Sequence, residues 1–326
     1  MSGRSEWWSV YIKHGASIAA QGYGRHRIAR LYGLPLNAAR RLKYYIDTHG
    51  APDDITEEAP AHDVQIQVKQ GRTHLVIGDA HAGPGQDLSR FKWLARFCHA
   101  HKPDVVVSIG DWFGLDSLCK HNSPKESEQQ RLQADLDAGN EALRIFDDEM
   151  RALNFKNGTT YNPRRVVTLG NHDARIMREA SQFPYMHGVL SYDLMHWKSY
   201  GWEVQPFGMP IEIDGVRYCH FFTRTGSPRA IAGQHHAATL VREGLGSTLV
   251  CGHSHQLHWY HRADHEGRRV HGLVVGCYFK HHEQYAGTSN GQWWRGLCLL
   301  HNVNQGDFDL ETWHISRIEA THGGMG

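Results

Sequence analysis

Five short segments of the chain carry residues that bind divalent metal ions, and in four of them a glycine comes first. They are Gly78-Asp79-Ala80-His81, Gly110-Asp111, Gly170-Asn171-His172-Asp173, His220 and Gly252-His253-Ser254-His255. Carboxylate, amide and imidazole groups are hard to borderline ligands, and the five segments contain no thiolate. A lone Gly-Asp pair is typical of a turn, whereas five such segments together predict a site for two divalent metal ions.

Most of these segments lie at or just after the ends of short apolar runs that have the length of buried strands. The runs cover residues 73–77, 104–109, 165–169 and 248–251. Helical patterns over residues 88–101 and 126–153 separate the first three runs. This alternation predicts an α/β fold with parallel strands and helices packed on the sheet faces. Side chains that follow such strands meet at one edge of the sheet, where ligands bind.

The later part of the chain has a different pattern of strands. Further apolar runs cover residues 211–213, 216–222, 270–278, 296–301 and 308–315. Gly215 marks a turn between the first two, so we expect these later strands to be mostly antiparallel. A helix is expected over residues 230–243.

In type and order, the five segments resemble the motifs of the calcineurin-like metallophosphoesterase family. Those motifs are Asp-x-His, Gly-Asp, Gly-Asn-His-Asp/Glu, a lone His and Gly-His-x-His, and the resemblance covers residues 71–316. It implies an αββα sandwich of two mixed sheets flanked by helices, which we place in a domain at residues 71–326. It also implies hydrolysis of a phosphate ester by a hydroxide that bridges two metal ions.

The resemblance implies a role for each residue of the motifs. Asp79, His81 and His255 would hold one metal ion, Asn171, His220 and His253 would hold the second, and Asp111 would bridge the two. Two cations at short distance repel each other, so an anionic bridge between them makes physical sense. His172 would donate a proton to the leaving group, and Asp173 would orient His172.

The type of metal and one ligand are less constrained than the rest. Mixed oxygen and nitrogen ligation without thiolate favours Mn, and also suits Fe, Zn or Mg, but argues against a structural zinc site. His220 competes with His235 and His236, which also precede the Gly-His-x-His motif. We favour His220, because it lies late in a predicted strand whereas the other two fall in a predicted helix.

Two aromatic groups are candidates for contact with the substrate. Trp112 and Phe113 directly follow the bridging aspartate and would form a wall of the pocket. Trp294 and Arg295 follow a polar loop and would stack a base and bind a phosphate. The alternative is that Trp293 and Trp294 anchor the core of the next strand.

The N-terminal 50 residues differ from the rest of the chain in charge and in pattern. The 326-residue chain has a net charge of +1, but residues 1–50 carry eight Lys and Arg against two Asp and Glu. Apolar residues recur at helical spacing on both sides of Gly33, and Pro35 suits the start of a helix. This pattern resembles a small all-α, helix-turn-helix-like domain. Residues 51–70, an acidic stretch between prolines, are typical of a linker.

The second helix of this domain would present polar and basic side chains to DNA. They are Asn37, Arg40, Arg41 and Lys43. The alternative is a helical cap whose basic face is only solvated and which serves for assembly.

Together, these features predict a metal-dependent phosphoesterase, and the basic N-terminal region favours a phosphodiesterase or nuclease that acts on nucleic acid. This combination of domains resembles proteins encoded by bacteriophages and prophages. One alternative is a small-molecule phosphatase or cyclic-nucleotide phosphodiesterase, and another is a DNA-binding regulator with a metal-binding scaffold domain. No apolar run reaches the ~20 residues of a membrane span. The six scattered cysteines predict reduced thiols, hence a cytoplasmic protein, in the host cytoplasm if phage-encoded.

Overall fold

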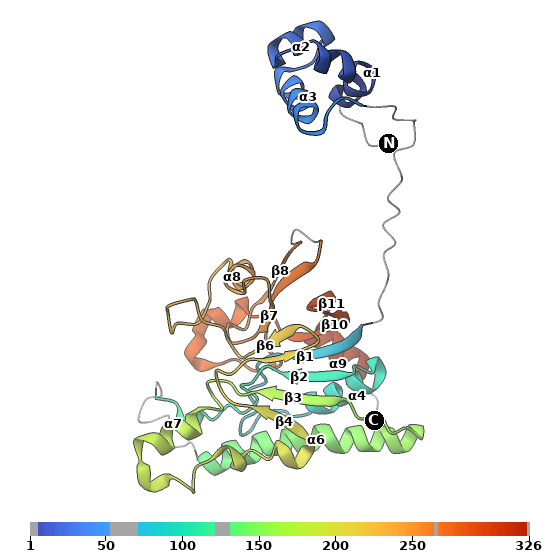
Figure 1. The fold of residues 1–326 in the computed structure, drawn as a ribbon. Coiled ribbons are helices and arrows are strands. Elements are labelled where there is room, and N and C mark those ends of the chain that lie inside the picture. Colours follow the sequence, from blue (N-terminus) through green and yellow to red (C-terminus); the bar gives the residue numbers. More distant parts are fainter. Residues whose placement is uncertain (1–5, 53–70, 121–130, 264–266, 325–326) are drawn as a thin grey trace. The chain divides into compact units, whose positions relative to one another are not determined.

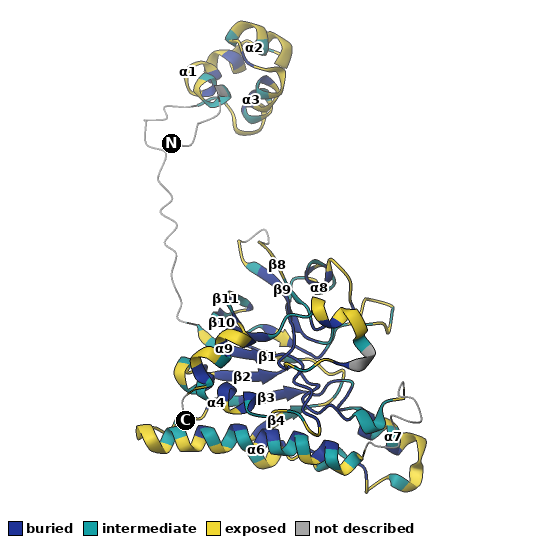
Figure 2. Ribbon diagram, turned by 180° about the vertical axis from the view of Figure 1, so that it is seen from behind, coloured by how far each residue is buried: buried dark blue, intermediate teal, exposed yellow. Residues whose placement is uncertain are grey.

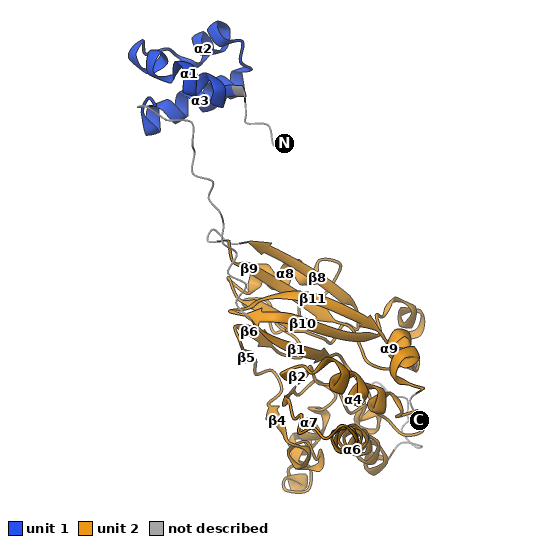
Figure 3. Ribbon diagram, turned by 90° about the vertical axis from the view of Figure 1, so that its right-hand side faces the viewer, with its two compact units in different colours: residues 1–67 blue, residues 68–326 orange. Residues whose placement is uncertain are grey.

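The chain divides into two compact units, residues Met1–Gln67 and Val68–Gly326 (Figure 3). The computed structural model describes residues 6–52, 71–120, 131–263 and 267–324. The predicted linker over residues 51–70 lies almost entirely outside the described residues, so the domain boundaries that we placed around it stay a prediction.

The first unit consists of three helices around a small apolar core. They are α1 (Glu6–Ala20), α2 (Arg25–Tyr32) and α3 (Leu36–His49). Helix α2 ends at Gly33, whose φ of 64° lies in the left-handed region that glycine adopts without strain. Pro35 directly precedes α3, as the sequence predicts. Ile28, Leu42 and Ile46 are buried in the core of this unit.

The first sheet of the second unit has the strand order β11-β10-β1-β2-β3-β4 (Figure 1). Its strands are β1 (Arg72–Ile77), β2 (Val105–Ser108), β3 (Arg164–Thr168), β4 (Trp202–Gln205), β10 (Gly296–Asn304) and β11 (Asp307–His314). Strands β1 to β4 pair in parallel, whereas β10 is antiparallel to both β1 and β11. The sheet is therefore mixed.

The second sheet has the order β5-β6-β7-β9-β8. Its strands are β5 (Ile211–Ile213), β6 (Val216–Tyr218), β7 (Thr248–Cys251), β8 (Leu257–Ala263) and β9 (Arg269–Val275). Strands β6, β7 and β9 are parallel, and only the hairpins β5–β6 and β8–β9 are antiparallel. Our expectation of mostly antiparallel strands is therefore wrong for the centre of this sheet, because α8 provides a crossover between β6 and β7.

Helices cover the outer faces of both sheets. They are α4 (Arg90–His101), α6 (Leu132–Asn157), α7 (Arg175–Gln182), α8 (His236–Glu243) and α9 (Ile315–His322). Short 3-10 turns are η1 (Asp116–Leu118), η2 (Pro184–Met186), η3 (Tyr192–Leu194), η4 (Lys198–Tyr200) and η5 (Gln284–Gln292).

Three apolar cores hold these layers together, and the buried strands β1 to β3 lie at the centre (Figure 2). One core packs α4 and α6 on the first sheet, a second fills the space between the sheets, and a third packs α8 on the second sheet. The predicted αββα sandwich is confirmed. Within the described residues, no helix is long and apolar enough to span a membrane.

Candidate metal centre

The five segments singled out in the sequence all follow the carboxyl ends of strands. Asp79 and Asp111 come shortly after β1 and β2, and Asn171 follows β3. His220 lies two residues beyond the end of β6, and His253 two residues beyond β7. The predicted strand over residues 216–222 is thus too long at its end, which leaves His220 in a loop. Because the neighbouring strands that precede these segments are parallel within each sheet, their carboxyl ends share an edge, and side chains from the edges of the two sheets meet in one cluster.

The side chains of these segments form three overlapping groups of buried donors. The groups are Asp79–His81–His255, His81–Asp111–His172 and Asp111–His220–His253, and within each group the ligand atoms lie within 4.8 Å of one another. His81 and Asp111 each belong to two groups. The groups therefore form one continuous cluster with Asp111 at its centre.

The Asp111 carboxylate contacts residues from several segments. Its Oδ1 accepts a hydrogen bond from the main-chain amide of His172 at 2.7 Å. Its Oδ2 lies 3.3 Å from His220 Nε2, 3.8 Å from His81 Nε2 and 4.0 Å from His172 Nε2. One carboxylate oxygen thus faces three imidazole nitrogens, which is the placement expected of a bridging ligand.

The remaining donors lie on the two sides of Asp111. On one side, His255 Nε2 is 2.8 Å from Asp79 Oδ2, and Asp79 Oδ1 accepts the main-chain amide of His253 at 3.1 Å. On the other, His220 Nε2 lies 2.9 Å from Asn171 Oδ1 and 3.2 Å from His253 Nδ1. The donor sets that the sequence assigns to two metal ions therefore lie close together in space.

Glycines in these segments make room for the ligands. A Cβ at Gly170 would overlap the carboxylate of Asp111, and one at Gly252 would overlap the carboxylate of Asp79. Gly110 has a φ of 93°, and a Cβ there would also meet the backbone of Gly170. Any side chain at these positions would displace a ligand.

Several ligands themselves adopt strained backbone conformations. The φ angles are 42° at His81, 48° at Asp111, 69° at His253 and 57° at His255. Residues with a Cβ rarely adopt positive φ, because each costs about 1–3 kcal/mol and persists only where the surrounding structure holds it in place. Such strain concentrates at functional sites, which agrees with a site built for ligands.

The residues present fit a pair of divalent cations. His81 Nε2 is buried and has no hydrogen-bond partner. Burial acts to raise the pKa of Asp79, but His255 and His220 outweigh it and lower the pKa to about 2. Burial likewise opposes ionisation of Asp111, yet His220 and His172 hold its pKa well below the usual range. Two buried carboxylates and the neighbouring imidazoles thus provide the oxygen and nitrogen donors that suit such cations.

Comparison with known proteins agrees with this geometry. Residues 73–257 match the model of the calcineurin-like phosphoesterase family, which is more than half of the chain. The chain belongs to this family. The match spans all five metal-ligand segments, from Asp79 to His255.

The sequence identity between this chain and individual proteins of known structure is low. No curated protein matches its sequence. Yfce, a phosphoesterase from E. coli, is similar in structure at 12% identity and a TM-score of 0.35, over 74% of this chain and 99% of that chain. TT1561 of Thermus thermophilus is similar at 13% identity and a TM-score of 0.29, over 75% of this chain and 99% of that chain.

His172 is held by two partners that the motifs do not reveal. Its Nδ1 donates to the Gly114 carbonyl at 2.7 Å, and its Nε2 accepts a hydrogen bond from Arg175 Nη2 at 3.0 Å. Arg175 Nη1 also donates to the carbonyls of Gly114 and Leu115, each at 3.0 Å. Burial lowers the pKa of His172 to about 3, although Asp111 opposes this shift. His172 is therefore neutral here, with its proton on Nδ1.

Asp173 does not orient His172, so that prediction is wrong. Its Oδ2 accepts the main-chain amides of Asp111 and Gly170, each at 2.8 Å, and its Oδ1 accepts that of Phe113 at 3.4 Å. The side chain is fully buried. It points back beneath the loop because three amides converge there, and it positions the backbone of Asp111 rather than the imidazole of His172.

The prediction that Trp112 and Phe113 form a wall of the substrate pocket is also wrong. Both side chains are fully buried in the core between the first sheet and its helices. Trp112 lies 5.4 Å from the ring of Trp197 and 4.7 Å from that of Phe91. The positive φ of Asp111 redirects the chain, so the residues that follow it point into the core.

The second aromatic group divides between core and site. Trp294 packs against the core between the sheets, which agrees with the alternative of a core anchor. Trp293 contacts His255 edge-on, with ring centroids 4.4 Å apart. Arg295 Nη1 donates to the carbonyls of Asn290 and Trp293 at 3.1 and 3.4 Å. Contact of Trp294 or Arg295 with a substrate stays a prediction.

Sequence reasoning missed two residues that contact the predicted site residues. Arg175 follows His172 by one helical turn, a spacing that would have suggested contact. Glu283 accepts a hydrogen bond from His81 Nδ1 at 2.8 Å. Glu283 and His81 are far apart in the sequence and share no motif, so only the fold brings them together.

In the first unit, the predicted DNA-binding residues lie on α3. Asn37, Arg40 and Arg41 are exposed, while Lys43 is half-buried and pairs with Asp47. A cavity of about 620 Å³ between α2 and α3 is lined by Arg25, Arg27, Arg40, Lys43, Tyr44 and other residues of these two helices. The exposed side of α3 thus carries cations.

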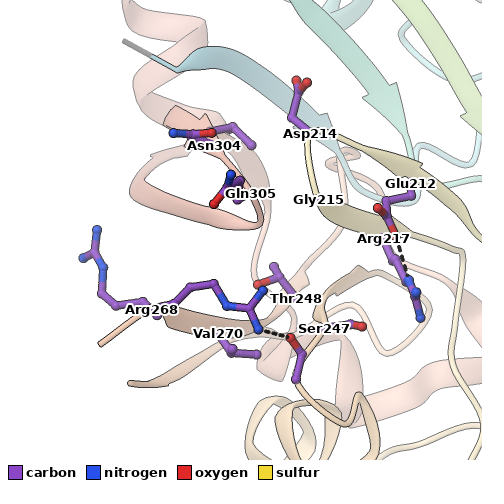
Figure 4. Close-up of a pocket in the computed structure, with 13 residues that line it drawn as sticks. Glu212, Asp214, Gly215, Arg217, Ser247, Thr248, Arg268, Val270, Asn304 and Gln305 are labelled. Atoms are coloured by element: carbon purple, nitrogen blue, oxygen red, sulfur yellow. Dashed lines mark hydrogen bonds and ion pairs between the residues drawn. The ribbon is translucent and has the colours of Figure 1, made fainter. Parts of the chain in front are cut away.

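A separate polar cavity of about 560 Å³ lies at the opposite ends of the strands (Figure 4). Thr248 and Val270, at the starts of β7 and β9, line it together with Arg217. His220 and His253 follow the other ends of β6 and β7. Arg217 is paired with Glu212 at 3.0 Å, and the cavity is distinct from the candidate metal centre.

Proposed function

We propose that this protein is a phosphodiesterase that uses two divalent metal ions to cleave nucleic acid, with Mn as the favoured metal. The proposal rests on one observation above all, the continuous cluster of donor groups with Asp111 at its centre. In this proposal, Asp79, His81 and His255 hold one metal ion, and Asn171, His220 and His253 hold the other. Bound metal ions of this kind activate water as a nucleophile and neutralise the charge on phosphate oxygens.

His172 is the candidate for protonating the leaving group. Its Nε2 lies beside Asp111, 4.0 Å from Oδ2, and faces the centre of the site. The pKa of His172 is lowered by burial, so the imidazole needs an anion nearby to take up a proton. A bound phosphate supplies that negative charge. Protonation of Nε2 would end its hydrogen bond from Arg175, and the guanidinium would then be available to the same phosphate.

The choice of nucleic acid as the substrate is supported by the first unit. Its α3 exposes Arg40 and Arg41 on the side that carries Asn37, and basic residues of α2 line the adjoining cavity. Such a surface suits the phosphates of a nucleic acid backbone. We propose that it binds DNA and so brings the substrate to the second unit.

Hydrolysis assays with Mn²⁺ test the catalytic part of the proposal. The wild type should hydrolyse bis-p-nitrophenyl phosphate, and Asp111→Asn should lose nearly all of this activity. The exposed Asp193 lies outside the cluster, so Asp193→Asn is a matched control and should retain it. An inert wild type that binds DNA normally would instead favour the regulator with a scaffold domain.

Substrate comparison tests the nucleic acid part. DNA cleavage by the full chain should fall at least about tenfold in Arg40→Gln/Arg41→Gln, while hydrolysis of the small diester stays unchanged. Lys13→Gln is the control, because it also removes a positive charge from an exposed position, but on α1. This variant should cleave DNA normally. Hydrolysis of a cyclic nucleotide or a phosphate monoester, without DNA cleavage, would favour the small-molecule enzyme.

A further inference from the structure

Glu283 lies directly behind one of the candidate metal ligands. Its Oε1 accepts hydrogen bonds from His81 Nδ1 at 2.8 Å and from His281 Nε2 at 2.9 Å. The side chain is buried, with 8% of the residue exposed. Because a carboxylate oxygen can only accept, Nδ1 of His81 carries the proton in this contact. Nε2, which has no hydrogen-bond partner, is therefore the ring nitrogen that is left to bind a cation.

Glu283 is itself fixed by a reciprocal pair of hydrogen bonds with Asn290. The main-chain amide of Glu283 donates to Asn290 Oδ1 at 2.9 Å, and Asn290 Nδ2 donates to the Glu283 carbonyl at 2.8 Å. Asn290 Nδ2 also donates to the Gly287 carbonyl at 2.9 Å. Asn290 is buried, so this loop holds Glu283 in one place rather than presenting it on a flexible surface segment.

Aromatic rings from the same stretch of chain pack on the same side of the site. The ring of Phe279 stacks on that of His81 at 5.0 Å with an interplanar angle of 25°, and lies 5.5 Å from that of His255. Trp293 contacts His255. On the other side of the site, His253 packs against Phe221 at 5.3 Å. Residues 279–293 therefore support the Asp79–His81–His255 group.

We propose that Glu283 is a positioning residue for His81 and sets the affinity of the metal position formed by Asp79, His81 and His255. This inference rests on the proposed two-metal function. A carboxylate behind a metal-bound histidine fixes its tautomer and ring orientation and increases its basicity, and loss of such a partner typically weakens metal binding about 10- to 100-fold. Glu283 lies beyond residues 73–257, so the support comes from a part of the chain outside the family match.

Titration of Mn²⁺ into the metal-free full-length protein, followed by calorimetry, tests this inference. The wild type should show two binding events. Glu283→Gln should weaken one event about tenfold and Glu283→Ala about 100-fold, while the other event changes less than about threefold. Glu311→Gln is the matched control, because Glu311 pairs with His301 at 2.8 Å on β10 and β11 and should leave both events unchanged.

The same substitution in an Asn171→Ala variant identifies which metal position is affected. Asn171→Ala should remove the other position and leave a single event, which Glu283→Gln should then weaken as it does in the full site. The inference would be overturned if Glu283→Gln, with the circular dichroism spectrum of the wild type, weakened both binding events equally or weakened neither. The proposed function would not be affected by that result. Absence of Mn²⁺ binding by the folded wild type would overturn the proposed function, and the inference with it.

Discussion

The carboxylate of Asp173 accepts the main-chain amide of Asp111 at 2.8 Å. This contact explains how a strained residue is kept in place, because Asp111 has a φ of 48° and carries the shared carboxylate of the cluster. The position of Asp111 thus depends on an aspartate from a different segment, which lies on the far side of the loop from the ligands.

Replacement of Asp173 by alanine should destabilise the protein and weaken metal binding together. The main-chain amides of Asp111 and Gly170 would lose their partners, at about 1–3 kcal/mol each. We expect the free energy of unfolding to fall by about 2–5 kcal/mol in urea denaturation. Asp193→Ala, on the surface, should change it by less than about 0.5 kcal/mol. Equal effects of the two substitutions would contradict the role given to Asp173.

Gly170→Ala should displace Asp111 and abolish binding of the metal pair. The added Cβ would overlap Asp111 Oδ1 and approach the main chain of the same residue, and neither is free to move. Metal content after dialysis against Mn²⁺ measures the effect. Gly24→Ala, in the first unit, is the control, since a Cβ there meets no atom within 4 Å. Full metal content in Gly170→Ala would show that the loop can relax.

Arg175→Ala should lower kcat more than it raises KM for bis-p-nitrophenyl phosphate. The substitution removes the hydrogen bond to His172 Nε2 and the links to the carbonyls of Gly114 and Leu115. We expect kcat to fall about 10- to 100-fold, because the position of His172 would no longer be fixed. Arg178→Ala changes an exposed arginine on the same helix and should keep kcat within about threefold of the wild type.

His236 should lower the stability of the metal-free protein as the pH falls from neutral. Burial, followed by His258 and His253, lowers the pKa of His236 from 6.5 to about 4. Between these values His236 binds a proton in the unfolded chain but not in the folded chain, so its contribution lowers the free energy of unfolding as the pH decreases. His236→Gln should reduce the loss between pH 7.5 and 5 by about 2 kcal/mol in urea denaturation with a chelator. His235→Gln, at an exposed neighbour, should leave the loss as in the wild type.

Mn²⁺ should raise the melting temperature of the wild type in proportion to the logarithm of its concentration. A cation that binds only the folded state at about 1,000 times its Kd adds about 4 kcal/mol of stability. Thermal unfolding with and without chelator measures this difference. Asp111→Ala should show a much smaller shift, because it lacks the shared carboxylate. The same shift in both proteins would place the bound ion elsewhere.

The sequence by itself determined the buried parallel strands of the first sheet and the residues that follow their carboxyl ends. Apolar runs such as residues 73–77 encode buried strands, and the segment after each run must leave the sheet at the carboxyl end of a strand. The roles of Gly110 and Gly170 could be predicted for the same reason. A sharp turn of the backbone and the close approach of a ligand to it are local requirements that glycine meets. Asp79, Asp111 and His253 could therefore be placed near one another from local pattern alone.

The tertiary structure decided which side chains contact and position those residues. Asp173 turns toward the amides of Asp111 and Gly170 rather than to His172, and Trp112 turns into the core. Glu283 reaches His81 from a segment about 200 positions away in the chain. Contacts of this kind depend on how the layers pack and on where the backbone reverses. Neither leaves a periodic signal in the sequence, because each is a property of two distant segments and not of either one.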